Sequence, residues 1–143
     1  MKFSSNQQDI QNSLNYCQGI IEKRSTLPIL SNVLLNVSKS KLTFTATDLD
    51  LIFIHTVNNV EVFEEGKTTT SSSIMYDIVR KISPGKKITF TNIGESKLNL
   101  ESESSVFNLN CINASEFPLT DEDFNENEFF INSKDLLKLL NKC

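Results

Sequence analysis

The sequence predicts an α+β fold built from a duplicated unit of one strand, one helix and three further strands. Two observations lead to this prediction. Two segments place apolar residues at helical spacing on one face, and each is followed by three short segments rich in β-branched and aromatic residues. A helix with a single apolar stripe needs a surface to cover, so we expect both helices on one face of an antiparallel sheet.

The first helix is expected over residues 9–21. Its apolar positions recur at spacings of four, three and four residues, at Ile10, Leu14, Cys17 and Ile21. The opposite face is rich in amides, at Gln8, Gln11, Asn12, Asn15 and Gln18. Gly19 weakens the last turn before a polar loop at residues 22–25.

The second half repeats this order of elements without convincing residue identity to the first. A Thr/Ser tract at residues 68–73 leads into a helix over residues 74–82, which ends at Ser83, Pro84 and Gly85. The strands that follow the two helices are expected over residues 32–37, 42–47 and 49–57, and over residues 87–93, 96–102 and 106–112.

A third cycle begins near the end of the sequence. Residues 129–140 repeat residues 3–14 at a constant shift of 126, matching Phe3 to Phe129, Asp9 to Asp135, Ile10 to Leu136 and Leu14 to Leu140. We therefore expect a domain over residues 1–118, an acidic connector over 119–127, and the truncated start of a second domain over 128–143.

The charge is unevenly distributed. The net charge is −4, but residues 116–128 hold six acids and no base, whereas residues 1–115 hold eleven of each sign. The body is thus neutral, and the overall acidity does not exclude a nucleic-acid partner. The sequence has no membrane span or signal peptide, which predicts a cytoplasmic protein. Cys17, Cys111 and Cys143 are odd in number and widely spaced, with no CxxC pair, so they suggest neither a disulfide framework nor a zinc site.

Two segments carry a family resemblance. RSTLPILSNVLLNV at residues 24–37 and LTFTATDLDL at 42–51 resemble the first domain of bacterial DNA polymerase III β subunits, the β sliding clamps. Three further features occur in the same order along the chain as in the family: the MKF start, a second helix ending near Arg80, and ASEFP at residues 114–118. The resemblance implies a fragment of a non-enzymatic processivity factor that tethers polymerase III to duplex DNA. It also implies a homodimeric ring of two head-to-tail chains with three domains each, whose helices line the hole.

The resemblance also implies which residues face DNA. Arg24 and Arg80 match DNA-facing positions of the family, Lys23 and Lys81 are their neighbours, and Gln18 and Asn15 are candidates for hydrogen bonds to DNA. Each of these side chains is alternatively a solvated surface group. The family can carry basic residues where this chain has residues 71–74, SSSI, so we expect sparser charge and weak, sequence-independent binding.

The last strand of the domain matches the edge that pairs with a second subunit in the family's ring. This match places Phe107 and Leu109 at the contact, with Lys97 nearby, although both apolar residues are alternatively core residues of the same sheet. Polymerase and clamp-loader peptides bind between the second and third domains in the family. We therefore expect this chain alone to bind no such peptide.

Two other classes of protein remain as alternatives. Asp48, Asp50 and His55 would be the basis of a small metal-dependent hydrolase, but the family places the aspartates at a strand connection. SPGKK at residues 83–87 lacks the spacing of a phosphate-binding loop, and no cofactor is expected. The other alternative is a stand-alone interaction module derived from a shortened clamp gene.

Overall fold

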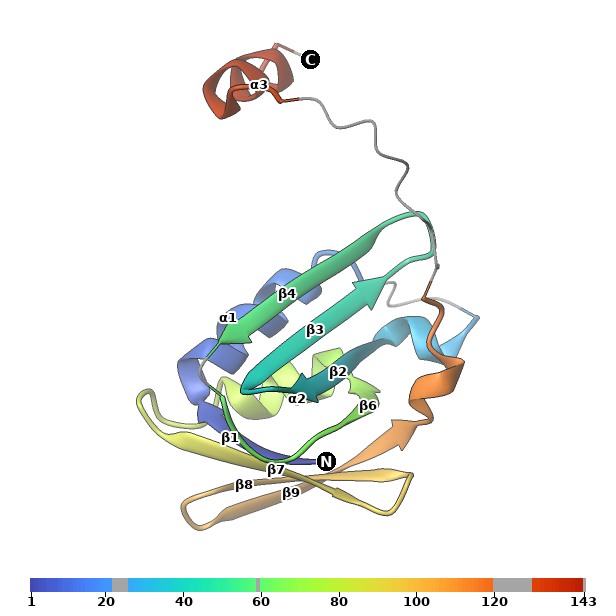
Figure 1. Ribbon diagram of the computed structural model, residues 1–143, viewed down its shortest axis with the longest axis vertical. Helices are drawn as coiled ribbons and strands as arrows, with labels where there is room; N and C mark the ends of the chain where they lie inside the picture. The colour runs from blue at the N-terminus through green and yellow to red at the C-terminus, as the bar shows by residue number, and fades with distance from the viewer. Residues whose placement is uncertain (22–25, 59, 120–129, 143) are drawn as a thin grey trace.

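The computed structural model describes residues 1–21, 26–58, 60–119 and 130–142. They form an α+β fold in which α1 and α2 lie side by side against one face of an antiparallel sheet (Figure 1). The elements are β1 Lys2–Asn6, α1 Gln7–Cys17, η1 Pro28–Ser31, β2 Asn32–Ser38, β3 Lys41–Thr47, β4 Ile52–Asn58, β5 Glu61–Glu64, β6 Gly66–Ser71, α2 Ser72–Val79, β7 Lys87–Ile93, β8 Lys97–Ser102, β9 Ser105–Ile112, η2 Ala114–Glu116 and α3 Ser133–Leu140.

The sheet joins the two halves by exchanging their first strands. Its order is β4-β3-β2-β6-β9-β8-β7-β1-β5, and every neighbouring pair is antiparallel. Strand β1 of the first half pairs with β7 of the second, and β6 of the second pairs with β2 of the first. The registers correspond, because Asn6 faces Lys87 and Ser71 faces Asn32, so each helix starts from the same point of its strand pair. Neither half can complete its sheet alone.

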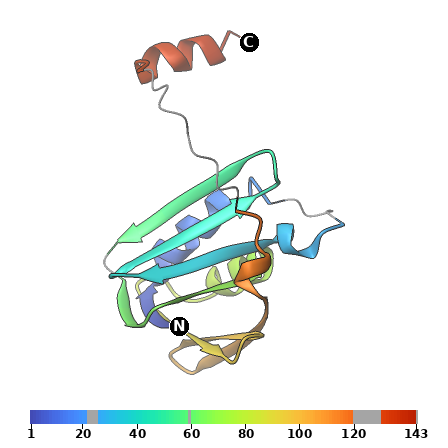
Figure 2. The same ribbon diagram turned by 45° about the vertical axis from the view of Figure 1, so that its right-hand side comes forward.

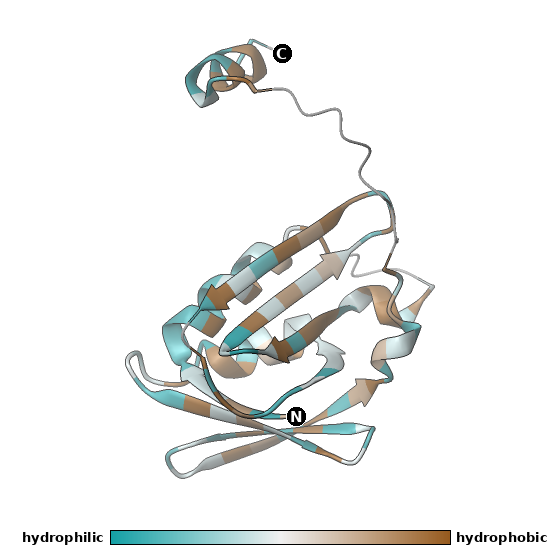
Figure 3. Ribbon diagram, in the orientation of Figure 1, coloured by the Kyte–Doolittle hydropathy of each residue, from teal (hydrophilic) through white to brown (hydrophobic). Residues whose placement is uncertain are grey.

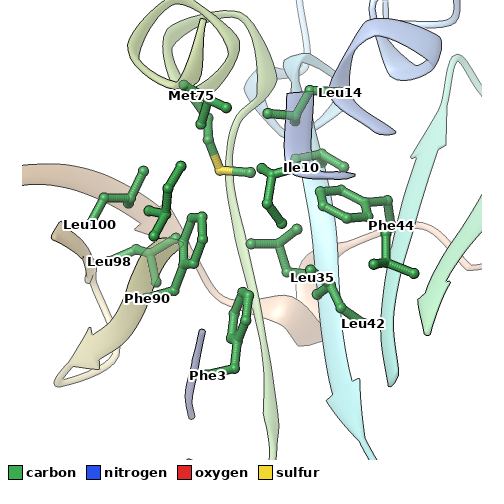
Figure 4. Close-up of a cluster of buried hydrophobic side chains, with 14 of the residues drawn as sticks. Phe3, Ile10, Leu14, Leu35, Leu42, Phe44, Met75, Phe90, Leu98 and Leu100 are labelled. Carbon is green, nitrogen blue, oxygen red and sulfur yellow. The ribbon is translucent and has the colours of Figure 1, made fainter. Parts of the chain in front are cut away.

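The core lies between the sheet and the two helices. Ile10 and Leu14 of α1 and Met75 of α2 are fully buried against side chains from both halves of the sheet (Figure 4). Phe3 stacks on Phe90 with ring centroids 4.6 Å apart, which joins β1 to β7. Colouring by hydropathy shows the alternation of apolar and polar residues along the strands (Figure 3).

Amide side chains join the two helices at both ends. Gln7, at the start of α1, is buried and its Nε2 donates a hydrogen bond to the carbonyl oxygen of Val79, 2.9 Å away. At the other end, the Nε2 of Gln18 donates to the hydroxyl oxygen of Ser72 over 2.9 Å. The helices therefore run antiparallel, and the Val79 carbonyl at the end of α2 accepts both the Gln7 amide and the backbone N–H of Ile82, 3.2 Å away.

The sequence predicted most elements but not all of their limits. Strand β5 was not expected, and α1 ends at Cys17 instead of residue 21. The strand expected from residue 49 begins at Ile52, because Leu49 adopts a positive φ of 85° and the Asp48 carboxylate accepts the backbone N–H groups of Asp50 and Leu51. These bonds close a turn between β3 and β4. Figure 2 shows both strands and the helices behind them from a second direction.

The third cycle contains a helix in the expected register. α3 begins at Ser133 after Asn132, whose side chain accepts the backbone N–H of Lys134, and α1 begins at Gln7 after Asn6. These starts differ by the same shift of 126 that relates the two sequences. Residues 130–132 are not in a strand, and Phe129 and residues 120–127 of the predicted connector lie outside the described residues.

Candidate nucleic-acid and subunit interfaces

The outward face of the helix layer is polar and electrically balanced. Within the described stretches 7–21 and 72–82 it holds two acids, Asp9 and Asp77, and two bases, Arg80 and Lys81. The amides of α1 bond to one another, since Gln8 Nε2 donates to Asn12 Oδ1 over 3.1 Å. Such a face can offer hydrogen bonds and a few positive charges to phosphates, with little net attraction.

Arg80 lies at the C-cap of α2 and is half exposed. Its guanidinium pairs with the Asp77 carboxylate over 3.0 Å and lies above the Tyr76 ring, 5.9 Å from the centroid. Lys81 follows it and is exposed. The structure thus brings two of the predicted DNA-facing bases together at one end of the helix pair.

The predicted amides lie elsewhere on the same layer. Asn15 is exposed on α1, where its Oδ1 is 3.5 Å from the Tyr76 hydroxyl. Gln18 is half-buried and its amide donates to Ser72, so it serves the contact between the helices as well as the surface. Lys23 and Arg24 lie outside the described residues, after the buried Ile21.

The packing at the start of α2 accounts for serines at residues 71 and 72, where the family can carry basic residues. The Ser71 side chain accepts the backbone N–H of Ile74 and caps the helix, while Ser72 is fully buried. The side chain of Ile74 is 53% exposed. Ser71 and Ser72 therefore serve the local fold, and none of the four positions adds a positive charge.

The second candidate surface is the free edge of β9. This strand pairs with β8 along residues 105–110, but its other side meets β6 only at Cys111 and Ile112. Among the described residues, the outer edge of 105–110 has no paired strand, and it carries no charged side chain. Such an edge is a template for a strand of another chain.

Successive side chains of β9 alternate between the core face and the outer face of the sheet. Leu109 is 6% exposed and belongs to the core, Phe107 lies half-buried at its border, and Lys97 is exposed on the neighbouring strand β8. The opposite face presents Val106, Asn108 and Asn110, which the sequence analysis did not single out. Their period of two along the strand was a usable signal, but it does not tell which phase is inward.

A hollow adjoins this edge between η1, the start of α2 and β9. It encloses about 300 Å³ and is lined by Pro28, Ile74 and Leu109, with polar groups of Ser31, Asn108 and Asn110 around them. If another strand paired with β9, one of its side chains could enter this hollow and contact the apolar residues that line it.

Asp48 and His55, two of the three residues that suggested a hydrolase, lie apart in different surroundings. Asp48 holds the turn before β4, as described above. His55 lies among aromatic rings, with its ring centroid 5.6 Å from that of Tyr16 and 6.3 Å from that of Phe53. It lines a hollow of about 500 Å³. Within the described part of the chain, no three His, Cys, Asp or Glu side chains lie close enough to hold a metal ion.

The two described cysteines are poor nucleophiles. Burial raises the pKa of the Cys17 thiol to about 12, and burial also raises that of Cys111 above its ordinary value, so both are protonated near neutral pH. Over the described ranges, no helix has the length and apolar character needed to cross a membrane.

Comparison with known proteins defines the class to which this fold belongs. Residues 1–121 match the family described as DNA polymerase III beta subunit, N-terminal domain, and the chain belongs to this family. The beta sliding clamp of Caulobacter vibrioides NA1000 is 30% identical over 99% of this chain, and that of Escherichia coli K12 is 33% identical over 98%. The chain spans 38% of the length of each of these relatives.

Solved structures confirm the α+β clamp fold. The DNA polymerase sliding clamp from Caulobacter crescentus matches 99% of this chain with a TM-score of 0.92 and 30% identity, and the chain covers 38% of it. The DNA polymerase III subunit beta from Pseudomonas aeruginosa matches 99% of this chain with a TM-score of 0.91 and 29% identity, again over 38% of its own length.

Proposed function

We propose that this chain supplies the first domain of a cytoplasmic DNA sliding clamp, a non-enzymatic ring that tethers DNA polymerase III to duplex DNA. The observation that carries the proposal is the match to the Caulobacter crescentus clamp over nearly the whole chain. Because this chain spans only 38% of that structure, ring closure and contacts with polymerase III and the clamp loader are part of the proposal. The latter contacts would use parts of the clamp that this chain does not span.

The proposed domain limits are 1–118, 119–127 and 128–143. The equal register of α1 and α3 supports a second domain after the connector. Leu136 and Leu140 occupy the positions of the buried Ile10 and Leu14, but they are 41% and 63% exposed. In a completed second domain, these leucines would be covered by its own sheet.

DNA would meet the helix layer at Arg80, Lys81, Asn15 and Gln18, and at Lys23 and Arg24. The layer is consistent with weak contacts to phosphates, because its described charges balance and several of its amides already bond to neighbouring side chains. Weak, sequence-independent contacts suit a ring that must slide while topology prevents its escape.

The test of this contact is a titration of short duplex DNA into the chain at low salt, followed by amide chemical shifts in NMR. Arg80→Gln should weaken binding several-fold and make the salt slope shallower by about 0.9, the effect of one lost phosphate contact. Lys41→Gln removes the same charge from an exposed position in β3, where the next residue, Leu42, faces the core, and is the matched control. Equal effects of the two substitutions, or a preference for particular DNA sequences, would contradict the proposal.

The subunit contact would form along β9. Its free, uncharged edge and the adjoining hollow support pairing with a strand of a second subunit, with Val106, Asn108 and Asn110 facing outward. In this arrangement Phe107 and Lys97 flank the contact, and Leu109 forms the floor of the hollow.

A further inference from the structure

Arg80 is engaged within its own helix. Asp77, three residues earlier, places Oδ1 3.0 Å from an Nη of Arg80, and the Tyr76 ring supports the guanidinium from below. The two charged side chains are 52% and 57% exposed, so both are accessible to solutes. An approaching phosphate must therefore compete with the Asp77 carboxylate for the same donor groups.

Asp77 is placed where a helix disfavours an acid. It lies near the C-terminal end of α2, where the helix dipole is negative, while the first turn, which favours acids, contains none. An exposed ion pair with an arginine three residues away contributes little to stability. The carboxylate is therefore poorly explained as a stabiliser of the helix, and its main consequence is for the availability of Arg80.

We propose that Asp77 is an intramolecular competitor that keeps Arg80 partly occupied and holds the affinity of the helix layer for DNA phosphates low. This inference rests on the DNA contact proposed above and deepens it. Each phosphate that binds Arg80 displaces a carboxylate and leaves it close to a second negative charge. Arg80 would thus exchange between an internal and an external anion, which favours short contacts along the duplex.

The experiment compares Asp77→Asn with Glu95→Gln in the full chain. Both remove one negative charge from an exposed side chain, but Glu95 lies in the hairpin between β7 and β8, away from the helices. In the DNA titration at low salt, Asp77→Asn should raise affinity about twofold and steepen the salt slope, because Arg80 becomes fully available. Glu95→Gln should change affinity much less.

A double variant separates competition from simple repulsion. If Asp77 acts through Arg80, the gain from Asp77→Asn should largely vanish in an Arg80→Gln background. An equal gain in both backgrounds, or no gain in the otherwise unchanged chain that binds DNA, would overturn the inference and leave the proposed function standing. Failure of both the unchanged chain and Asp77→Asn to bind DNA at any concentration would overturn the DNA contact itself, and this inference with it.

Discussion

The two halves of the domain place their buried residues alike and their surface residues differently. Ile10 on α1 and Met75 on α2 lie at equivalent positions 65 residues apart, and both are fully buried. Outside the core, the two halves differ. α1 presents an amide-rich face, whereas α2 ends in the Asp77–Arg80 pair. The last strands of the two three-strand runs also differ, because β4 is an edge strand of the sheet and β9 lies between β6 and β8.

This difference teaches that duplication preserves what the shared core requires and leaves the exposed positions open to change. Both helices must fit against a sheet to which each half contributes, so their inward positions correspond. No such requirement acts on the outward face, where DNA and subunit contacts would form. Variants at equivalent positions therefore test the likeness directly.

The largest effect is expected in the shared core. Ile10→Ala and Met75→Ala should each lower the free energy of unfolding by about 3 kcal/mol, because each leaves a cavity in the same packed interior. Urea unfolding followed by circular dichroism measures both, and each variant should retain a single transition. A second transition in either variant would show that the halves unfold separately.

The two side-chain hydrogen bonds that join the helices, from Gln7 and from Gln18, should contribute differently to stability. Gln7→Ala should cost about 2 kcal/mol, because it removes a buried side chain and its hydrogen bond to the Val79 carbonyl, which then keeps only the backbone N–H of Ile82. Gln18→Ala should cost about 0.5 kcal/mol, since Gln18 is only half-buried and its loss opens Ser72 to water. Urea unfolding measures the loss of unfolding free energy in each variant, and equal losses would contradict this ranking.

The buried thiol should make stability depend on alkaline pH. The Cys17 pKa is raised from 9.0 to about 12, so the folded chain keeps the thiol protonated while the unfolded chain ionises it. This contribution is complete below pH 9 and is lost as the pH rises toward 12, by about 1 kcal/mol at pH 10. Cys17→Ala should remove this part of the slope, whereas Cys111→Ala, at a less buried position, should leave most of it.

The smallest change in stability is expected at the edge strand β4 and at the unpaired outer side of β9. Val106→Lys on β9 and Ile54→Lys on β4 replace side chains that are 58% and 63% exposed, so each should shift the free energy of unfolding by less than about 0.5 kcal/mol. Sedimentation should distinguish them, because a lysine on β9 blocks the proposed pairing edge and weakens self-association at high concentration. Association that survives Val106→Lys but not Ile54→Lys would assign the contact to β4.

The sequence predicted the order of the elements from Lys2 to Ile112 well, since hydrophobic spacing depends only on near neighbours. It missed β5, because the four residues Glu61–Glu64 are half charged and become a strand only by pairing with β1. It also extended the β4 strand through Leu49, where the Asp48 side chain closes a turn instead. Both errors concern residues whose structure depends on a particular partner.

By itself, the sequence determined the fold class, the duplicated plan and the family, because helical spacing, strand composition and a long matching segment are all local properties. Only the tertiary structure decided that the halves exchange their first strands, that Leu109 lies in the core while Val106 faces outward, and that Arg80 pairs with Asp77. The reason is physical. Strand partners, the phase of an alternating strand and the occupancy of a charged side chain are set by the surrounding elements and their packing.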